Sequence, residues 1–230
     1  MKEKIIIALD VSSRREALTL VESLHSMTGM FKVGMQLYTA EGPSFVRDII
    51  AAGGKVFLDL KFHDIPNTVR KAALEAAKLG VSMMTIHASG GQAMMQAVSD
   101  ELRERFGEKR PIVVGVTVLT SMDDGALRET GVSSSMDEQV LRLVKLAEDS
   151  SLDGVVCSPR EIQMIRSAVG RNFKIVTPGV RMPGQAADDQ QRTATPREAI
   201  SNGADYIVVG RAVTNAPHPH TALEGLLQSL

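Results

Sequence analysis

Short apolar runs rich in Ile and Val recur along the chain at intervals of roughly 20 to 30 residues, and most segments between them have helical periodicity or helix-forming residues. The apolar character of each run is continuous rather than alternating, which is typical of parallel strands that helices cover on both faces. The pattern predicts eight strands, at residues 5–10, 31–36, 55–60, 82–88, 111–118, 154–158, 174–180 and 206–211.

Helix-capping signals occupy several of the gaps between these runs. In four places a Ser or Thr precedes a Glu by three positions, which is the spacing of a capping box, and a Pro that suits the first helical position follows two of these caps. The pairs are Ser13 with Glu16, Ser135 with Glu138, Ser158 with Glu161 and Thr195 with Glu198, and the prolines are Pro159 and Pro196. Gly80 and Gly203 each follow a helical stretch, at the position where a left-handed residue commonly ends a helix.

Eight strand-plus-helix units without a break in composition predict an α/β fold, a (β/α)₈ TIM barrel that forms a single domain over residues 1–230. A doubly wound parallel sheet is the alternative. No glycine-rich fingerprint follows the first strand, and this disfavours the doubly wound arrangement.

The overall charge and composition exclude several classes of partner. Lys and Arg number 26 against 27 Asp and Glu, so the chain has no general field to hold a nucleic acid or an anionic membrane. Aromatic residues make up only 3% of the chain, which argues against a base-stacking surface for single-stranded nucleic acid. The longest apolar run, residues 112–119, is far shorter than the ~20 residues of a bilayer span.

Cys157 is the only cysteine, so an intrachain disulfide is impossible and a reducing compartment fits. The apolar run at the start of the chain is shorter than the ~7–15 residues of a secretory signal. We therefore expect a cytoplasmic location, with Cys157 as a small buried core residue.

Charged residues fall where the predicted strands end. Asp10 ends the first strand, Lys32 lies in the second, Asp59 and Lys61 close the third, and Asp64 follows in the next loop. In a barrel of this kind the reactive groups lie at the C-terminal ends of the strands. Asp59 and Lys61 are two positions apart on a strand, so their side chains are expected to leave the same face.

We interpret Lys32, Asp59, Lys61 and Asp64 as a functional array of two cations and two anions, in which each charge keeps its neighbours ionised. Such an array places a carboxylate against one part of a ligand and an ammonium group against the adjacent part. An ion-pair network that only closes the mouth of the barrel is the alternative.

Two loops are predicted to bind an anion. The segment 177–196 is long for a connection between a strand and a helix, which is typical of a lid or binding loop, and it contains Arg181 and Gln190. Gly210 and Arg211 follow the eighth strand at a helix start, where backbone N–H groups favour an anion. The loops after strands seven and eight are the recurrent phosphate site of this fold, so a phosphate-bearing ligand is expected; a solvated charge at Arg211 is the alternative.

The pattern of histidines does not assign them a specific function. His87 ends the fourth strand, where it lines the pocket or serves as a hydrogen-bonded structural residue, and His63 has no assigned role. No acidic or cysteine residue accompanies His218 and His220, so we expect no metal site there and none elsewhere.

Seven short segments, in this order along the chain, resemble bacterial-type orotidine 5′-monophosphate decarboxylases. They are ALD (8–10), KVG (32–34), DLKFHDIPNTV (59–69), HASGG (87–91), VTVLTS (116–121), TPGVR (177–181) and VVGRAVT (208–214). The resemblance runs from Ile5 to about Asn215, and the third segment is its most specific part. It implies decarboxylation of orotidine monophosphate to uridine monophosphate without a cofactor or metal, the last step of de novo pyrimidine synthesis.

The resemblance also implies a role for each site residue. Lys61 is the proton donor to the ring carbon that loses carbon dioxide, and Asp59 faces the departing carboxylate. Asp64 and Thr68 are contributed by the partner subunit of a homodimer. The remaining expected substrate contacts are Asp10 and Lys32 to the ribose hydroxyls, Thr120 to the pyrimidine, and Arg181, Gln190, Gly210 and Arg211 to the phosphate.

Three other functions stay open from the residues alone. Metal-dependent sugar-phosphate decarboxylases and epimerases of the same barrel superfamily share an Asp-x-Lys-x-x-Asp element. A Schiff-base aldolase would use Lys61 or Lys32 as its nucleophile. A nucleotide-binding barrel without catalysis is the third, although binding a phosphate alone does not require buried opposing charges.

Overall fold

The eight predicted strands form a closed parallel barrel in the computed structural model of the chain, which describes residues 1–180 and 194–230. Each strand pairs with its neighbours in sequence, and β8 closes the ring by pairing in parallel with β1. The strands are β1 (Ile5–Ala8), β2 (Met30–Gly34), β3 (Val56–Phe62), β4 (Met83–His87), β5 (Ile112–Val116), β6 (Gly154–Val156), β7 (Lys174–Thr177) and β8 (Tyr206–Val209). The predicted TIM barrel is confirmed, and the doubly wound alternative was wrong.

The strand boundaries differ from the predicted ones by a few residues. The second strand was predicted to run to residue 36, but it ends at Gly34 because Met35 begins the next helix. The third strand was predicted to end at residue 60 and continues to Phe62. The strand therefore includes Lys61, which was expected to close it.

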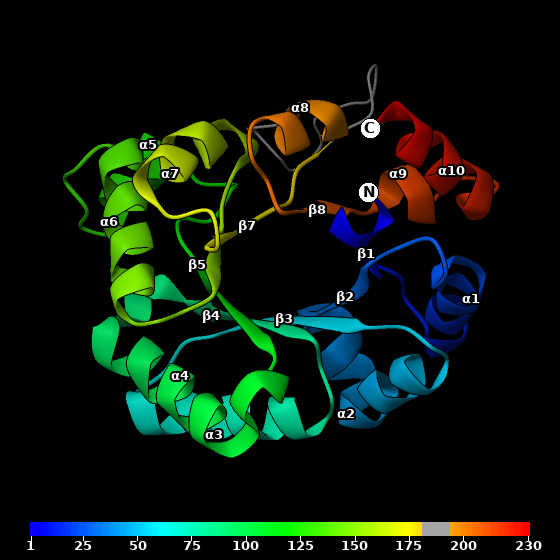
Figure 1. Ribbon diagram of the computed structural model, residues 1–230, viewed down its shortest axis with the longest axis horizontal. Helices are drawn as coiled ribbons and strands as arrows, with labels where there is room; N and C mark the ends of the chain where they lie inside the picture. Colours follow the sequence, from blue (N-terminus) through cyan, green and yellow to red (C-terminus); the bar gives the residue numbers. More distant parts are fainter. Residues whose placement is uncertain (181–193) are drawn as a thin grey trace.

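The helices form an outer ring around the strands (Figure 1). Within the described residues they are α1 (Arg14–Leu24), α2 (Met35–Ala51), α3 (Pro66–Lys78), α4 (Gln92–Phe106), α5 (Asp124–Glu129), α6 (Met136–Asp149), α7 (Ile162–Ala168), α8 (Pro196–Ser201), α9 (Arg211–Thr214) and α10 (Pro219–Ser229), with short 3₁₀ turns η1 (Lys2–Lys4), η2 (Ala88–Gly90), η3 (Gly107–Lys109) and η4 (Pro159–Glu161). None of these helices is long and apolar enough to cross a membrane.

The predicted capping signals are present. Reciprocal capping boxes form at Ser135, Ser158 and Thr195, whereas at Ser13 the side chain accepts the backbone N–H of Glu16. Gly80 follows α3 with a φ of 88°, a left-handed conformation that glycine adopts without steric cost.

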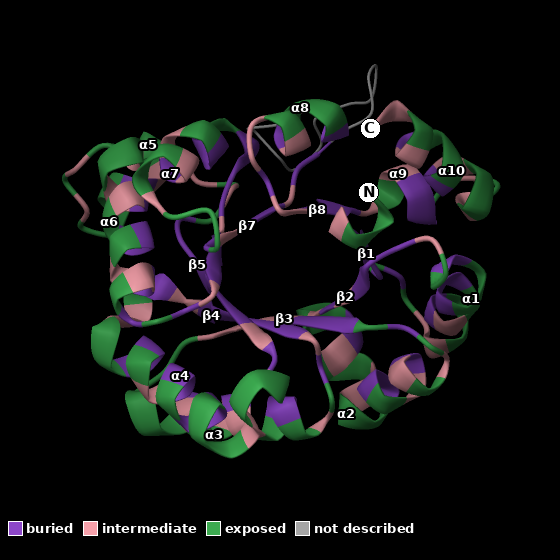
Figure 2. Ribbon diagram, viewed as in Figure 1, coloured by how far each residue is buried: buried purple, intermediate pink, exposed green. Residues whose placement is uncertain are grey.

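Apolar side chains pack in two zones, one inside the strand ring and one between the ring and the helices. The inner zone is a cluster of interior strand residues, namely Ile6, Ala8, Met30, Phe57, Met83, Val114, Val176 and Val208. The outer zone contains the alternate strand residues, such as Ile5, Ile7 and Phe31, and the inward faces of the helices. Figure 2 shows the buried strands at the centre and the exposed residues on the outward faces of the helices. Cys157 is buried in the outer zone, as predicted.

Two Arg–Asp pairs hold the N-terminal ends of the last four strands. Arg110 donates to both carboxylate oxygens of Asp153 at 2.6 Å, and Asp153 also accepts the backbone N–H of Val113 in β5 at 2.8 Å. Asp205 makes the corresponding bonds one strand pair later: it accepts from Arg166 at 2.6 Å and from the backbone N–H of Ile175 in β7 at 2.9 Å. Each aspartate directly precedes its own strand, so it joins that strand to the one before.

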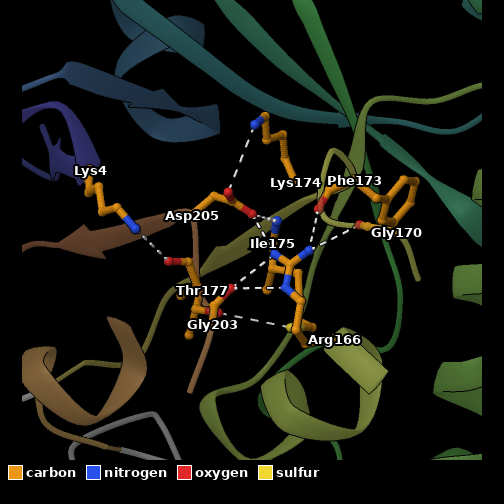
Figure 3. Close-up of polar contacts among 11 residues, drawn as sticks. Lys4, Arg166, Gly170, Phe173, Lys174, Ile175, Thr177, Gly203 and Asp205 are labelled. Carbon is orange, nitrogen blue, oxygen red and sulfur yellow. Dashed lines mark hydrogen bonds and ion pairs between the residues drawn. The ribbon is translucent and has the colours of Figure 1, made fainter. Parts of the chain in front are cut away.

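Arg166 also bonds to the turns that precede β7 and β8 (Figure 3). From α7 its guanidinium also donates to the carbonyl oxygens of Gly170 at 3.2 Å, Phe173 at 2.9 Å and Gly203 at 2.9 Å. These carbonyls belong to the turns before β7 and β8. A single half-buried side chain therefore fixes both turns, and we name Arg110, Asp153, Arg166 and Asp205 the N-terminal clamps.

Candidate active site

The charged residues at the C-terminal end of the barrel occupy the next inward-facing positions of its strands. Side chains two positions apart on a strand share a face. Ala8, Met30, Phe57 and Met83 line the inside of the barrel, so the next interior positions are Asp10, Lys32, Asp59 and Thr85. The register agrees, because Ala8 pairs with Lys32 and Gly34 with Asp59. The interior thus changes from apolar to polar within two residues along each of the first four strands.

Three of these side chains, Asp10, Lys32 and Asp59, form a row of alternating charge together with Lys61. The Nζ of Lys32 lies 3.1 Å from Oδ1 of Asp10 and 3.9 Å from Oδ2 of Asp59. The Nζ of Lys61 is 2.9 Å from each oxygen of Asp59. The order is Asp10, Lys32, Asp59 and Lys61, and we call these residues the charged row. The predicted common face of Asp59 and Lys61 is therefore observed.

The middle of the charged row is the most deeply buried part. The side chains of Lys32 and Asp59 are 14% and 13% exposed, whereas those of Lys61 and Asp10 are 26% and 55% exposed. Charges removed from water are costly unless opposite charges and hydrogen bonds compensate them. Asp59 meets this requirement by accepting from Lys61 and from the hydroxyl of Thr85 at 3.0 Å. The ammonium group of Lys61 remains accessible at the open end of the row.

The backbone at Lys61 is unusual for a strand. Its φ is 52°, in the left-handed region that few non-glycine residues adopt. The pairing between β3 and β4 shifts at this point, since Leu58 pairs with Met84 but Phe62 pairs with Ile86. The third strand therefore bulges opposite Thr85, and the backbone N–H of Lys61 bonds to the Thr85 hydroxyl at 2.9 Å. Strained residues of this kind concentrate at functional sites.

Two glycines leave space around the charged row. A Cβ at Gly34 would lie 3.3 Å from Nζ of Lys32, and one at Gly210 would lie 3.7 Å from Oδ2 of Asp10. The described residues enclose a cavity of about 190 Å³ that is lined by Leu9, Asp10, Val11, Lys32, Gly34, Met35, Gln36, Leu37, Asp59 and Lys61. Met35 is 56% exposed and supplies an apolar wall beside the charges. Gly34, Met35 and Thr85 were not among the site residues predicted from the sequence.

Asp64 and Thr68 do not join the charged row within this chain. Both side chains are exposed, and Asp64 accepts the backbone N–H of Ile65 at 2.7 Å. Asp64 makes no ion pair among residues 1–180 and 194–230. The prediction that Asp64 belongs to one array with Lys32, Asp59 and Lys61 is therefore not met by a single subunit. Ile65 is 67% exposed between the two residues, which is unusual for a large apolar side chain.

The structure describes two of the four residues predicted to bind the phosphate. Gly210 directly follows β8 at the mouth of the barrel, and Arg211 begins α9 beside it. Helix α9 has only four residues, so any anion would be held by the charge of Arg211 and by local N–H groups rather than by a long helix dipole. Thr120 lies half-buried after β5. Arg181 and Gln190 lie outside the described residues.

His63 and His87 lie next to each other near the charged row, with ring centroids 5.2 Å apart. Burial lowers the pKa of His87, and repulsion from His63 and from the Lys61 ammonium group lowers it further, against the opposing effect of Asp59. His87 is therefore held in its neutral form near pH 7, in which it can both donate and accept a hydrogen bond.

No group of three or more His, Cys, Asp or Glu side chains suited to a metal ion occurs among the residues that the structure describes.

A second hollow, of about 460 Å³, lies at the other end of the barrel and is lined by Arg103, Gly107, Glu108, Arg110, Pro111, Ile112 and Asp153. It is larger than the cavity at the charged row, but both terminal nitrogens of Arg110 already donate to the two carboxylate oxygens of Asp153. The charged row is therefore the better candidate for chemistry.

A sequence model of the orotidine 5′-phosphate decarboxylase / HUMPS family matches residues 3–226. The chain belongs to this family. A relative named orotidine 5′-phosphate decarboxylase, from Vibrio cholerae, is 48% identical over 227 residues, which are 99% of this chain and 98% of the relative. A protein of the same name from Syntrophotalea carbinolica is 50% identical over 232 residues, covering all of this chain and 95% of the relative.

Solved structures of the orotidine 5′-phosphate decarboxylase / HUMPS family agree with the barrel described above. The crystal structure of orotidine 5′-phosphate decarboxylase from Lactobacillus acidophilus superposes with a TM-score of 0.86 at 39% identity, over 97% of each chain. The family resemblance and the fold read from the sequence are both confirmed.

Proposed function

We propose that this protein converts orotidine 5′-monophosphate to uridine 5′-monophosphate and carbon dioxide, the last step of de novo pyrimidine synthesis. Membership of the decarboxylase family supports the reaction. The observation that carries the proposal is the charged row at the C-terminal end of the barrel interior, where Lys61 presents an accessible ammonium group beside the buried Asp59. This is the end of the fold at which barrel enzymes place their chemistry.

Lys61 is the proposed proton donor. Breaking the bond between the ring carbon and the carboxylate leaves an electron pair on a carbon that delocalises it poorly. A preorganised ammonium group at that carbon stabilises the developing negative charge and then supplies the proton that replaces carbon dioxide. Lys61 regains its proton from solvent after the product leaves.

Asp59 is proposed to act on both partners of this step. It holds Nζ of Lys61 through both of its oxygens at 2.9 Å, which fixes the direction of the ammonium group. In this position Asp59 faces the departing carboxylate of the substrate. Lys32 lies 3.9 Å from Asp59 on the other side and balances its charge.

The remaining expected residues are proposed to bind the substrate. Asp10 and Lys32 line the cavity beside the charged row, where ribose hydroxyls would meet them. Arg211 and Gly210 are proposed to hold the phosphate at the end of β8. Thr120 is proposed to contact the pyrimidine, and Arg181 and Gln190 to complete the phosphate end. Contacts to a phosphate that is remote from the reacting carbon supply binding energy for alignment.

We also propose a homodimer in which Asp64 and Thr68 complete the site of the partner subunit. The support is that Asp64 and Thr68 are exposed beside the highly exposed Ile65, at the same end of the barrel as the charged row. A mixing experiment tests this proposal. Lys61→Ala and Asp64→Asn subunits are each expected to be nearly inactive, whereas refolding them together is expected to restore about a quarter of wild-type activity, because half of the dimers then carry one intact site. Absence of restoration in a dimeric mixture would contradict a shared site.

The metal-dependent relatives are disfavoured by the donor chemistry of the charged row. Asp59 already accepts from Lys61 and Thr85, and Asp10 accepts from Lys32, so neither carboxylate is arranged to ligate a divalent cation. A Schiff-base aldolase would need a lysine amine that is held neutral, whereas both lysines here are paired with a carboxylate. A cytoplasmic location stays a prediction from the sequence.

The direct test is the ultraviolet absorbance of orotidine 5′-monophosphate on mixing with purified, chelator-treated protein. The expected result is rapid loss of the substrate band with release of one carbon dioxide for each uridine 5′-monophosphate formed. No change with folded, dimeric protein would contradict the proposal. Activity that returns only when a divalent cation is added would favour the metal-dependent relatives, and trapping of a carbonyl substrate by borohydride would favour the aldolase.

A further inference from the structure

The bulge in β3 leaves the backbone N–H of Lys61 without its usual partner on the neighbouring strand. From Leu58 to Phe62 the strand advances four residues, while β4 advances only two, from Met84 to Ile86. Lys61 lies in the excess segment with a φ of 52°. A buried backbone N–H without an acceptor is costly, so this conformation needs a hydrogen-bond acceptor from β4.

Thr85 is the β4 residue opposite the bulge, and its hydroxyl supplies that acceptor. The side chain is fully buried, and Oγ1 accepts the N–H of Lys61 at 2.9 Å. The same oxygen donates its proton to Oδ1 of Asp59 at 3.0 Å. A hydroxyl can accept and donate at once, whereas an aliphatic side chain of the same shape can do neither.

The three residues close a ring of hydrogen bonds around Lys61. Its main chain is bonded to Thr85, Thr85 is bonded to Asp59, and Asp59 is bonded to Nζ of Lys61 at 2.9 Å. The backbone and the ammonium group of one residue are thus fixed through the same hydroxyl. Without that hydroxyl, the ladder offers no second acceptor to hold Lys61 in the left-handed conformation, and Asp59 loses one of the bonds that fix its carboxylate.

We infer that Thr85 is a positioning residue that sets where the Lys61 ammonium group stands at the reacting carbon. The inference rests on the proposed decarboxylation, in which the placement of this group determines the rate. Thr85 does not itself line the cavity and acts through Lys61 and Asp59, which do. Misplacement of a reacting group by about 1 Å costs roughly 10²-fold in rate.

The test compares Thr85→Val, which removes the hydroxyl and keeps the shape, with Thr85→Ser, which keeps the hydroxyl. For Thr85→Val, kcat is expected to fall by about 10²-fold while KM changes by less than about threefold, because the ribose and phosphate contacts are untouched. Thr85→Ser is expected to stay within about threefold of the wild type in both. A Thr85→Val protein that folds and keeps kcat within about twofold would overturn the inference.

Thr28→Val is the matched control. Thr28 is also a buried threonine, but its hydroxyl bonds to the carbonyl of Ile5 at 2.9 Å at the other end of the barrel. It is expected to lose stability without losing kcat. If Thr85→Val fails to fold, Thr85→Cys replaces it, since a thiol is a weak donor and acceptor and should give an intermediate loss of kcat. Full kcat in folded Thr85→Cys would overturn the inference.

A second readout separates failure of this inference from failure of the proposed function. The rate at which an acylating reagent labels the Lys61 amine, measured by mass spectrometry without substrate, reports the surroundings of that group directly. Labelling at Lys61 is expected to rise in Thr85→Val and to stay unchanged in Thr85→Ser and Thr28→Val. If the wild type fails to decarboxylate but this labelling pattern holds, the function is wrong and the positioning stands; if the wild type is active and the labelling rates are equal, the positioning is wrong.

Discussion

The two ends of the barrel use the same kinds of side chain for opposite purposes. At the N-terminal end, Arg166 and Asp205 bond to each other and, between them, to four backbone groups, so their polar atoms are used within the protein. At the C-terminal end, Lys61 bonds to Asp59 through its side chain and still faces a cavity. The first arrangement is complete as it stands, whereas the second has an ammonium group that a ligand can reach.

The choice of cation agrees with this difference. A guanidinium is planar and makes several fixed hydrogen bonds at once, which suits Arg110 and Arg166 at strand ends that must stay in register. An ammonium group is a compact charge that can give up a proton, which suits Lys61. The two arginines thus secure strand ends, whereas Lys61 presents an ammonium group to the cavity.

Lys61→Ala is expected to have the largest effect on activity. Loss of both the proton donor and the positive charge should lower kcat by at least about 10⁴-fold, while the affinity for uridine 5′-monophosphate changes by less than about tenfold. Turnover is measured by absorbance and affinity by titration calorimetry. Lys174→Ala is the control, because this lysine lies 3.8 Å from Asp205 at the other end of the barrel and should leave kcat unchanged. Near-normal turnover in Lys61→Ala would remove the proton-donor role.

Arg211→Ala is expected to have the next largest effect. Loss of a charged phosphate contact should lower kcat/KM by about 10²-fold, or about 3 kcal/mol of transition-state stabilisation. Orotidine, which lacks the phosphate, provides the control substrate: the variant and the wild type should use it equally poorly. An unchanged kcat/KM for the nucleotide would remove Arg211 from the site.

Arg166→Ala should affect stability and leave catalysis intact. The variant removes the guanidinium partner of Asp205 and the side-chain donor to three backbone carbonyl groups, which should lower the free energy of unfolding by about 2 kcal/mol. Urea denaturation measures this loss, and kcat of the folded protein should stay within about twofold of the wild type. A fall in kcat without a change in the free energy of unfolding would contradict this prediction, because Arg166 would then affect catalysis rather than stability.

His87→Asn is expected to have the smallest effect and to appear only in acid. Burial and nearby positive charge lower the pKa of His87 in the folded protein, so the unfolded chain binds more protons as the pH falls below about 6.5. Stability contributed by neutral His87 is therefore present above that pH and is lost as the pH falls toward the folded pKa. Denaturation midpoints between pH 7 and pH 5 should decline less in His87→Asn than in the wild type. Parallel declines would contradict this role of His87.

The sequence was sufficient for the barrel because its signals are local. Each strand is a continuous apolar run, and boxes such as that of Ser135 with Glu138 mark helix starts without any tertiary information. The common face of Asp59 and Lys61 also followed from their spacing. Spacing alone did not predict the conformation of Lys61, however, because the bulge and the positive φ at this residue depend on pairing with β4.

The missed residues carried weaker signals. Thr85 is a single hydroxyl inside the run MMTIH, and its position opposite Lys61 becomes visible only in the register of two strands. In the sequence Gly34 looks like an ordinary strand end. Its lack of a side chain leaves room for the Lys32 ammonium group, which a Cβ at this position would approach to 3.3 Å. Asp64 was grouped with the charged row because it is near in sequence, but a single chain turns it toward the backbone of Ile65. The substrate roles assigned to individual residues stay predictions.

The most direct test of this division of labour is an experimental structure of the protein with bound uridine 5′-monophosphate. The account predicts the pyrimidine at the C-terminal end of the barrel, with the ring carbon that gains the proton within about 3.5 Å of Nζ of Lys61 and the phosphate at Arg211. A nucleotide bound beside Arg110 and Asp153, or one at the C-terminal end whose ring carbon lies beyond reach of Lys61, would contradict it.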